Sequence, residues 1–505
     1  ADLNRCHRAD RGMGVRLDRP GCRPARFLLL GRGTLVSELT VDQGAIDAVL
    51  ARVAEEGLEV VRISFADQHG ILRGKTVMAA DLESAFRSGI AMTSTLLLKD
   101  TSHRTVFPVW QEDAGFGEGR LTGAGDVLMH PDPATFKVLP WSPHSGWMQA
   151  DLTDADGVPL EVCSRGILRR AVERLNAQGY ELITGLEVEF HVLEVTDPKL
   201  GHADTGQPEA VPETALVSHG YQYLTEDRYD QLEDVFDLVR RNAVALGLPV
   251  RSFEAEFGPS QCEVTFHPAP AMEHADNMIL FRSMVKQVCR RAGLHATFMC
   301  RPKFKDAMAS GWHLHQSIVD LESGENLFIP EEGQALSALC GNWVAGLLEH
   351  AAESCLLSTP TVNGYKRYRP FTLAPDRVQW GRDNKGAMIR ALAKPGDKAS
   401  RVENRVGEPT ANPYLYMASQ ILAGLDGIER SLAAPAPVER PYDSDAEKLP
   451  SSLEHAIGLF RQSSFFRKTL GDAYVDYYSH IKQAEWDRYA QAVSEWEERE
   501  YFSLF

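Results

Sequence analysis

The stretch GLEVEF, residues 185–190, constrains this chain more than any other, because it places two carboxylates inside an apolar pattern typical of a buried strand. Glu187 and Glu189 are two positions apart. In an extended strand, side chains with this spacing leave the same face of the sheet. At about 5 Å and an effective dielectric of 20, two such anions repel each other by roughly 3 kcal/mol. The sequence therefore predicts a positive group beside the pair.

Composition excludes several classes of protein. The 505 residues exceed the length of one ordinary domain core, and 44% hydrophobic residues are typical of a globular protein. The net charge of -17, from 70 acidic and 53 basic residues, argues against nucleic acid as a partner. The eight cysteines include no CxxC pair, which favours a reduced, cytoplasmic protein. No apolar run approaches the roughly 18 residues of a membrane helix, so we expect no membrane partner.

Three regions differ in pattern along the chain. Residues 1–38 are rich in arginine and show no helical or strand period, which indicates a disordered or cloning-derived extension. A transit peptide is the alternative, but such peptides are rich in serine and poor in acidic residues. Residues 39–150 combine a helix over 41–56 with a hairpin around 67–70 and short apolar pieces, as in a small β-rich domain. Residues 151–505 form a larger domain.

The larger domain mixes helices with a hairpin. Apolar periodicity predicts helices over 164–179, about 229–246 and about 272–292, and a helical tail over 453–504. Two alternating runs within 251–266 flank a Gly-Pro-Ser turn, which indicates a β-hairpin. Because a hairpin pairs its strands antiparallel, we expect an α+β fold with an antiparallel sheet.

Four strand-like stretches offer oxygen or imidazole ligands. A Glu-x-Glu on a strand is most often a solvated outer face, and a His-x-His is most often a surface or core pair, so each alone carries little. Together, carboxylates and imidazoles without thiolates make a hard site, which suits Mg²⁺ or Mn²⁺ better than zinc or copper. The candidate ligands are Glu187, Glu189, Glu256, Glu263, His313, His315 and Glu403.

Arginines interleave with these ligands, at Arg367, Arg390, Arg401 and Arg405. Guanidinium groups are the usual partners of phosphates and carboxylates. No G-x-x-x-x-G-K-[ST] motif occurs, which excludes a P-loop nucleotide site, and we interpret the Gly-rich stretch GFGEGRLTG at 115–123 as a loop. Hard cations and arginines without a P-loop are a setting for phosphoryl transfer by charge neutralisation.

Six motifs resemble, in order and spacing, the signatures of the glutamine synthetase superfamily: GLEVEF, EFGPSQCEVTF, SGWHLHQS, NGYKRYRP, WGRDNKGAMIR and RVENRVGEPTANPYLYMASQILAGLDGI. The resemblance spans about 40 to 505. It implies an N-terminal β-grasp domain, a catalytic domain with a curved antiparallel sheet, and a dodecamer of two hexameric rings with active sites between neighbouring subunits. It also implies glutamate and an amine as substrates, and ATP with two or three Mg²⁺ or Mn²⁺ ions as cofactors.

The resemblance implies two groups of metal ligands. The ligands of the first metal, which also meets the substrate glutamate, are Glu189, Glu256 and Glu263. The ligands of the second metal, which handles the nucleotide phosphates, are Glu187, His313 and Glu403. The implied catalytic residues are Glu256, Arg367 and Asp67, and a neighbouring subunit lends Asp67 to the amine site.

The resemblance also implies contacts with the substrates. The residues that meet ATP are His315, Ser317, Lys385, Arg390 and Arg401. Arg367 and Arg405 hold the glutamate carboxylate and the transferred phosphoryl group. ATP would phosphorylate the γ-carboxylate of glutamate, and an amine would attack the resulting acyl phosphate while Asp67 accepts its proton.

One position departs from the family in a way that bears on the amine. Two residues before Pro375, where glutamine synthetases carry a glutamate that helps to hold ammonium, this chain has Leu373. An apolar side chain here, lined by Phe371, Tyr368 or Trp380, favours an organic amine. We therefore expect a glutamate-amine ligase similar to the γ-glutamylanilide synthase branch, which joins an aryl or alkyl amine to glutamate as a γ-glutamyl amide.

Two alternatives stay open. One is glutamine synthesis from ammonium, and the other is a catalytically silent scaffold, which would tolerate lost metal ligands although none of the six is lost. Lys385, where the family usually has arginine, and MASG at 308–311 are further departures that do not decide between them. Tyr442 lies near where some family members are adenylylated, but RPYDSDAEK matches weakly, so we expect no modification.

Overall fold

The structure is a computed structural model that describes residues 27–30, 34–37, 42–112, 121–199 and 201–505. It contains two compact units, and the sequence boundary between them lies between Asp42 and Gln43. In the first unit, the strands β1 (Phe27–Leu30) and β2 (Thr34–Ser37) form an antiparallel pair.

Two expectations fall largely on residues outside this description. They are the disordered or cloning-derived extension over 1–38 and the Gly-rich loop at 115–123. The three domain ranges stay predictions.

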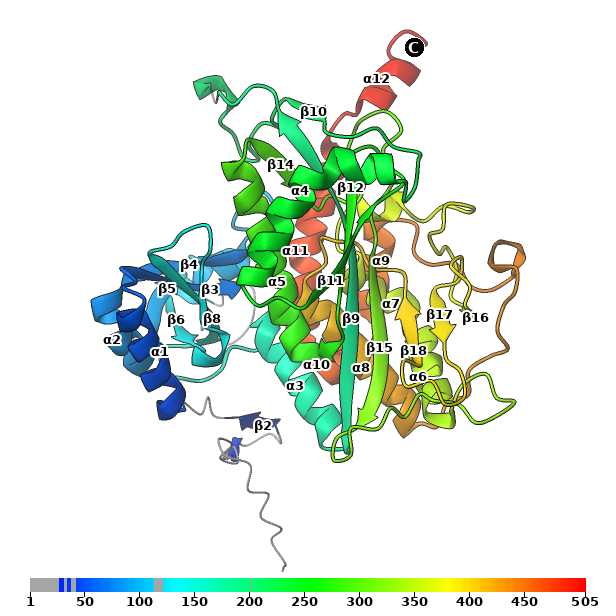
Figure 1. Cartoon of the computed structure of the whole chain (residues 1–505), viewed down its shortest axis with the longest axis horizontal. Helices are drawn as coiled ribbons and strands as arrows, with labels where there is room; N and C mark the ends of the chain where they lie inside the picture. Colours follow the sequence, from blue (N-terminus) through cyan, green and yellow to red (C-terminus); the bar gives the residue numbers. More distant parts are fainter. Residues whose placement is uncertain (1–26, 31–33, 38–41, 113–120, 200) are drawn as a thin grey trace, which may run out of the picture. The chain divides into compact units, whose positions relative to one another are not determined.

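The second unit begins with a small mixed sheet. Its strands are β3 (Val60–Ala66), β4 (Leu72–Met78), β5 (Ile90–Thr93), β6 (Asp126–Pro131), β7 (Lys137–Val138) and β8 (Ser145–Thr153). They lie in the order β4-β3-β8-β6-β5, with β7 beside β8, and the β3 and β8 pair is parallel. The helix expected over 41–56 is confirmed as α1 (Gln43–Glu55), and α2 (Leu82–Ser88) contacts β4 and β6. This sheet with its helices confirms the expected β-grasp architecture (Figure 1).

The expected hairpin around 67–70 is the turn between β3 and β4, which pair antiparallel. Gly70 has a φ of 69°, a conformation that favours glycine. A Cβ atom at Gly70 would also lie 2.7 Å from Nη2 of Arg282, more than 200 positions later in the sequence. The turn therefore requires glycine for both conformation and close packing.

The second sheet has ten strands, and β9 (Tyr180–Val195) is its central member. The others are β10 (Thr214–Leu216), β11 (Val250–Ala255), β12 (Gln261–Phe266), β13 (Ala269–Pro270), β14 (Leu294–Thr297), β15 (Trp312–Asp320), β16 (Trp380–Arg382), β17 (Ile389–Leu392) and β18 (Arg401–Asn404). The order is β11-β12-β9-β15-β18-β17-β16, and β10, β13 and β14 also pair with β9. The predicted antiparallel arrangement is confirmed, including the hairpin of β11 and β12, although β16 and β17 run parallel.

Ten further helices follow the small sheet in the described part of the chain. They are α3 (Ser164–Asn176), α4 (Glu226–Ala245), α5 (Ala271–Arg291), α6 (Ala338–Glu349), α7 (Ala351–Ser358), α8 (Pro413–Glu429), α9 (Leu453–Gln462), α10 (Ser464–Leu470), α11 (Asp472–Gln491) and α12 (Glu495–Tyr501). The helices expected over 164–179, 229–246, 272–292 and 453–504 are therefore confirmed. Throughout the described part of the chain, every helix is too short or too polar to span a bilayer.

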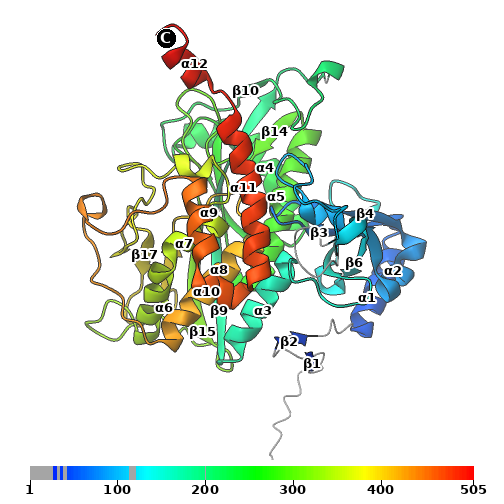
Figure 2. The same ribbon diagram turned by 180° about the vertical axis from the view of Figure 1, so that it is seen from behind.

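The helices leave one face of the large sheet free for polar side chains. The even-numbered residues of β9 from Leu182 to Val192 are buried, and α3 and α5 pack against this strand. Behind them α8 is apolar on all sides, so it forms the centre of the core and contacts α3, α5, α6 and α7. Seen from behind in Figure 2, α9, α10 and α11 lie in front of the sheet. Glu187 and Glu189, at odd positions of β9, point to the opposite face of the sheet, away from α3 and α5.

A buried arginine joins the small sheet to the helices. The guanidinium group of Arg165 on α3 lies 2.7 Å from a carboxylate oxygen of Asp132, 3.0 Å from Asp151 and 2.9 Å from Asp276. The hydroxyl group of Tyr414 on α8 donates to Asp276 at 2.6 Å. The buried cation is thus shared among three anions from β8, the segment after β6, and α5, which fixes how these elements meet.

A second buried cation connects α7, α8 and the C-terminal helices. The Nδ1 atom of His350 lies 2.7 Å from Glu353, its Nε2 atom lies 2.8 Å from Asp426, and its ring stacks on Phe465 with centroids 3.6 Å apart. Burial alone would lower the pKa of His350, but the hydrogen bonds to Glu353 and Asp426 raise it above its ordinary value. Because both ring nitrogens face carboxylates, His350 is an imidazolium ion.

We expect the contribution of His350 to stability to depend on pH. Since its pKa is higher in the folded chain than the ordinary value of about 6.5, the stabilisation is complete below about pH 6.5 and is lost as the pH rises through the folded value. The substitution His350→Gln should therefore lower the free energy of unfolding by about 1–2 kcal/mol at pH 6 and by less at pH 9. Urea unfolding followed by tryptophan fluorescence at the two pH values measures this difference.

The matched control is His455→Gln, at an exposed histidine on α9. This variant should be as stable as the wild type at both pH values. A loss for His350→Gln that is equal at pH 6 and pH 9 would contradict the imidazolium assignment.

Candidate active site

A row of ionisable side chains crosses five adjacent strands of the large sheet. Glu263 on β12 pairs in register with Glu189 on β9, and Glu187 on β9 pairs with His313 on β15. Farther along, His315 pairs with Glu403 on β18, and Glu403 pairs with Arg390 on β17. Glu256 follows the last residue of β11. Strand pairing therefore collects into one row the residues that are dispersed over more than 200 positions of the sequence.

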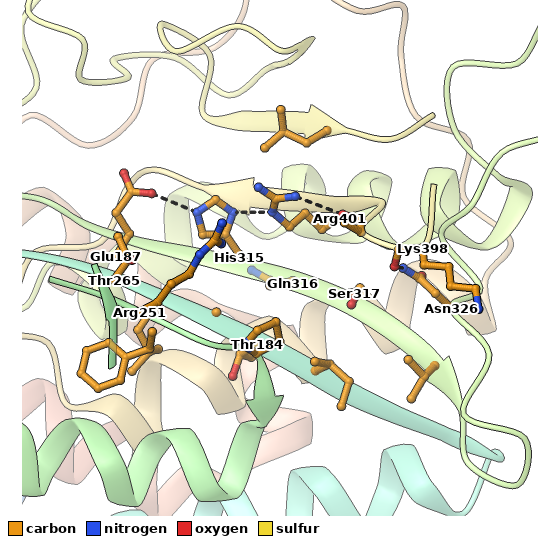
Figure 3. Close-up of a pocket in the computed structure, with 18 of the residues that line it drawn as sticks. Thr184, Glu187, Arg251, Thr265, His315, Gln316, Ser317, Asn326, Lys398 and Arg401 are labelled. Carbon is orange, nitrogen blue, oxygen red and sulfur yellow. Dashed lines mark hydrogen bonds and ion pairs between the residues drawn. The ribbon is translucent and has the colours of Figure 1, made fainter. Parts of the chain in front are cut away.

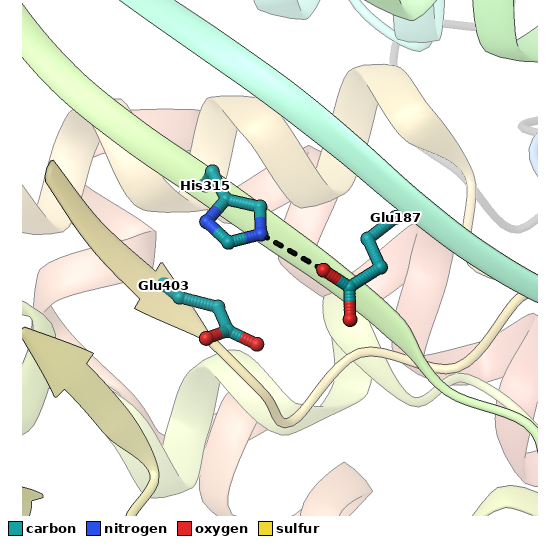
Figure 4. Close-up of side chains that lie close together, drawn as sticks. All are labelled: Glu187, His315 and Glu403. Carbon is teal, nitrogen blue, oxygen red and sulfur yellow. Dashed lines mark hydrogen bonds and ion pairs between the residues drawn. The ribbon is translucent and has the colours of Figure 1, made fainter. Parts of the chain in front are cut away.

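Two histidines flank Glu187. The Nδ1 atom of His313 lies 2.7 Å from one carboxylate oxygen of Glu187, and the Nε2 atom of His315 lies 3.1 Å from the other. Figure 4 shows Glu187 and His315 from neighbouring strands, with the carboxylate of Glu403 beside them. The second nitrogen of each ring accepts from an arginine: Arg401 donates to His315 at 3.1 Å, and Arg367 to His313 at 3.3 Å. Each imidazole is therefore neutral and donates to Glu187.

The histidines and the arginines decide which carboxylates are ionised. Burial opposes the charge on Glu187, but His313 and His315 hold its pKa well below the usual range. Burial likewise opposes the charge on Glu403, and Arg405 lowers its pKa. Burial, and then the charge of Arg405, lower the pKa of His313 to about 4. Glu187 and Glu403 are thus carboxylates at neutral pH.

The remaining carboxylates of the row resist ionisation. Burial, and then the charge of Glu256, raise the pKa of Glu189 to about 8. Burial raises the pKa of Glu256 to about 7, and burial with the charge of Glu187 raises the pKa of Glu263. Gln261 donates to Glu189 at 2.9 Å. Without a bound cation these groups hold protons near neutral pH, and a divalent ion would replace the protons.

The ligand atoms lie close enough to hold metal ions. In two groups, Glu187 with His315 and Glu403, and Glu187 with Glu263 and His313, one ligand atom of each residue lies within 4.8 Å of the others. Carboxylate and imidazole donors are the set that suits Mg²⁺ or Mn²⁺. Glu187 is shared by both groups, so the division of ligands between two metals stays a prediction.

The row lies at the junction of two cavities. The larger, of about 1180 Å³, is lined by Arg251, His315, Ser317, Arg390 and Arg401 among others. Figure 3 shows Glu187, His315 and Arg401 linked in sequence, with Ser317, Asn326 and Lys398 farther along the cavity. The smaller cavity, of about 640 Å³, is lined among others by Glu189, Glu256, Glu263, His313, Arg367, Leu373, Lys385 and Arg405. Glu187 and Arg390 line both cavities, so the row forms the wall that the two cavities share.

The arginines of the cleft are held in place by bonds to this row of side chains and to the backbone next to it. Arg405 bonds to Glu403, and Arg390 lies 3.1 Å from Glu403. Arg367 is buried, and its Nη1 atom donates to the carbonyl oxygen of Arg405 at 2.8 Å. A Cβ atom at Gly311 would lie 2.6 Å from Nη2 of Arg367, so glycine leaves the room that this guanidinium needs. Lys385 is exposed at the edge of the smaller cavity.

Asp67 lies apart from the row in a single chain. Its buried carboxylate accepts from the backbone N–H groups of His69 and Ile71 and lies 2.6 Å from Nε of Arg73. The residues described as lining the two cavities do not include Asp67. A role at the active site of a neighbouring subunit stays a prediction.

The wall around Leu373 differs in part from expectation. Leu373 is 47% exposed and Phe371 is 81% exposed, and both line the smaller cavity. Tyr368 instead bonds through its hydroxyl group to the carbonyl oxygen of Val406 at 3.1 Å, and the indole of Trp380 donates to Pro435 at 2.7 Å. The partly buried Tyr368 and the buried Trp380 therefore each bond to a partner inside the protein.

Sequence reasoning missed two further residues of the cleft, Glu254 and Tyr223. Glu254 lines both cavities, and its signal was the stretch FEAEF, which repeats the Glu-x-Glu spacing of GLEVEF. Tyr223 lines the smaller cavity and stacks on Phe257 with centroids 4.2 Å apart. Tyr442, named above for its sequence position, is not among the residues described as lining either cavity, but its ring centroid lies 4.9 Å from that of Phe371 and its hydroxyl group donates to the carbonyl oxygen of Ala374.

Comparisons with known proteins agree with this geometry. Residues 161–501 match the family described as glutamine synthetase, catalytic domain. The γ-glutamylanilide synthase of Acinetobacter sp is 42% identical over 479 residues, which cover 91% of this chain and 96% of that protein. The glutamine synthetase of Thermus thermophilus is 31% identical over 474 residues, which cover 90% and 98%. The solved structure of apo GmaS without ligand has a TM-score of 0.75 at 28% identity and covers 90% of this chain and 99% of that chain.

We expect Mn²⁺ binding at pH 7 to release protons. Glu189 and Glu256, with pKa values of about 8 and about 7, hold protons that a metal ligand must lose. The affinity for Mn²⁺ should therefore rise between pH 6 and pH 9. Calorimetric titrations at pH 7 in two buffers with different ionisation enthalpies measure the number of protons released.

The substitution Glu263→Gln keeps the shape of the side chain and should weaken Mn²⁺ binding by about tenfold or more. Glu322→Gln, at an exposed glutamate, is the control and should bind as the wild type does. Equal heats in the two buffers would show that these carboxylates are already ionised, and would contradict the assignment.

Proposed function

The chain belongs to the glutamine synthetase family of ligases, and on that premise we propose that it uses ATP to join an amine to the γ-carboxylate of glutamate. The product is a γ-glutamyl amide, and γ-glutamyl phosphate is the intermediate. One observation carries the proposal: the row from Glu263 to Arg390 separates two cavities, so two substrates can meet over a set of hard ligands. The six described cysteines are free and buried, which suits the cytoplasm.

The larger cavity is the proposed nucleotide site. His315, Ser317, Arg390 and Arg401 line it, and the guanidinium groups suit the phosphates of ATP. Two or three Mg²⁺ or Mn²⁺ ions at the row would neutralise the charge that develops on the phosphoryl oxygens. Arg390 reaches both cavities and is therefore placed to follow the phosphoryl group as it moves toward glutamate.

The smaller cavity is the proposed glutamate site. Arg367 and Arg405 line it and would bind carboxylate and phosphoryl oxygens, and Lys385 adds a positive charge at its edge. The carbonyl contacts of Arg367 hold its guanidinium in place before a substrate arrives. This preorganisation lowers the cost of orienting glutamate for phosphorylation.

The amine is proposed to be organic, aryl or alkyl. Leu373, Phe371 and the stacked Tyr223 line the cavity that also contains the glutamate-binding arginines. A second ammonium group of a polyamine would lack an acidic partner at Leu373. The relative at 42% identity is named for an anilide product, which supports an aniline-like amine. In a dodecamer of two hexameric rings, Asp67 of a neighbouring subunit would accept the proton of the amine.

We expect turnover to be faster with aniline or isopropylamine than with ammonium or putrescine. Phosphate release with ATP, Mg²⁺, glutamate and each amine measures this order. The substitution Leu373→Glu should move the ratio of kcat/KM values toward ammonium by about tenfold, because a carboxylate stabilises ammonium and disfavours an apolar ring.

Leu321→Glu is the matched control, since Leu321 is also an exposed leucine and lies on a loop after β15. It should keep the wild-type preference. Fastest turnover of the wild type with ammonium would establish the alternative, glutamine synthesis.

The alternative hypothesis, that the chain is a catalytically silent scaffold, predicts a different result for a substitution at Glu187. If the row is catalytic, Glu187→Ala should reduce ATP-dependent phosphate release by about 100-fold or more, since it removes a shared metal ligand. Glu194→Ala is the control, because Glu194 is an exposed glutamate on the same strand. Equal activity of the wild type and the Glu187→Ala variant would show that the row of ionisable side chains is not catalytic.

A further inference from the structure

A third cavity lies outside the cleft. It has a volume of about 530 Å³ and lies among the β3–β4 turn, α5, the segment after β14, residues 360–363 and α11. Its residues are distinct from those described as lining the two cavities of the cleft. A cavity of this size is within the range that holds small organic ligands.

The walls of this cavity are mainly apolar. The apolar side chains come from four separate parts of the fold, namely Ile71, Leu72, Ile279, Phe298, Met299 and Pro360. Ile71 is 48% exposed and Met299 is 41% exposed, so both lie at the mouth, whereas Phe298 is buried. An apolar body of a ligand would therefore lie against aliphatic and aromatic groups.

The charged groups of the cavity are all basic. Arg282, Lys286 and Lys482 line it, and the lining residues that the structure describes include no aspartate or glutamate. This contrasts with the net charge of -17 of the chain. A concave site with one sign of charge concentrates ligands of the opposite sign.

Arg282 lacks a carboxylate partner among its described hydrogen bonds. Its guanidinium donates to the carbonyl oxygens of Gly70, Pro409 and Ala411, at 2.6 Å, 2.9 Å and 3.0 Å. Burial lowers the pKa of Arg282 to about 10, so it is still charged at neutral pH. Lys286 lies one helical turn farther along α5, on the same side of the helix. An anion beside these residues would offset their mutual repulsion.

The base of the cavity has further hydrogen-bonding capacity. The Nδ1 atom of His69 is buried and has no hydrogen-bond partner in the described part of the chain. The ammonium group of Lys482 is also buried and lies 2.9 Å from Glu485. The Nε2 atom of His69 donates to the carbonyl oxygen of Lys99 at 3.0 Å, so the unpaired Nδ1 atom is an acceptor. It would pair with a donor such as water rather than with a carboxylate.

We propose that this cavity binds a small organic anion with an apolar body, such as an aryl monocarboxylate. The carboxylate would lie beside Arg282 and Lys286, and the ring would lie against Ile279, Phe298 and Met299. One such ligand would touch both the turn that contains Asp67 and the segment 360–363 that leads to Arg367.

Isothermal titration of the full chain with 1-naphthoate tests this proposal. We expect one binding site per chain and binding at least tenfold weaker for the neutral analogue 1-naphthylmethanol. The substitution Lys286→Gln should weaken 1-naphthoate binding by tenfold or more, because it removes a charge at the mouth. Lys305→Gln, at an exposed lysine elsewhere on the surface, should leave the binding unchanged.

Two substitutions that fill the cavity from opposite walls locate the site. Ser283→Trp on α5 and Met299→Trp after β14 should each abolish 1-naphthoate binding while the ligase activity persists. If Ser283→Trp fails to fold, Met299→Trp at an exposed position decides the outcome. The proposal is wrong if 1-naphthoate does not bind, if the neutral analogue binds equally well, if glutamate displaces 1-naphthoate, or if the folded tryptophan variants still bind it.

Discussion

The repulsion among the carboxylates of the central sheet is the interaction on which the rest of this structure depends. Glu187 and Glu189 leave the same face of β9, and strand pairing adds Glu263 and Glu403 beside them. The protein does not place the same positive group beside each one. Neutral histidines stabilise the charge on Glu187, arginines stabilise the charge on Glu403, and protons remain on Glu189 and Glu263 until a cation replaces them.

Such a concentration of charge needs a rigid support. The opposite face of β9 is buried and, apart from Thr184, apolar, and it packs on α3 and α5, with α8 behind them. Arg165 and His350 add buried cations where helices meet other elements, each shared between two or more carboxylates. Because the frame is tightly packed, the ligand atoms keep their spacing even though their charges repel.

The wall of the smaller cavity around Leu373, where we propose that the amine binds, depends on an unusual backbone conformation. Phe371 and Leu373 both have positive φ values, 62° and 57°, which are uncommon for residues other than glycine. The main chain is therefore held in a conformation that its side chains do not favour, and this places two apolar groups in a cavity that also contains Arg367 and Arg405. The carbonyl oxygen of Leu373 accepts from Arg405 at 3.2 Å, which connects this wall to the row.

The sequence by itself determined the local features of this protein. The period of two placed Glu187 with Glu189 and His313 with His315, and helical periodicity located α1, α3, α4 and α5, because both signals depend on neighbours along the chain. Tertiary structure decided which strands lie side by side. It therefore also decided that Glu187 contacts His313 and His315, which follow more than 120 positions later. It also decided that Tyr368 and Trp380 turn inward while Phe371 faces the cavity. Packing and hydrogen bonding between distant segments set these outcomes, and no local pattern records them.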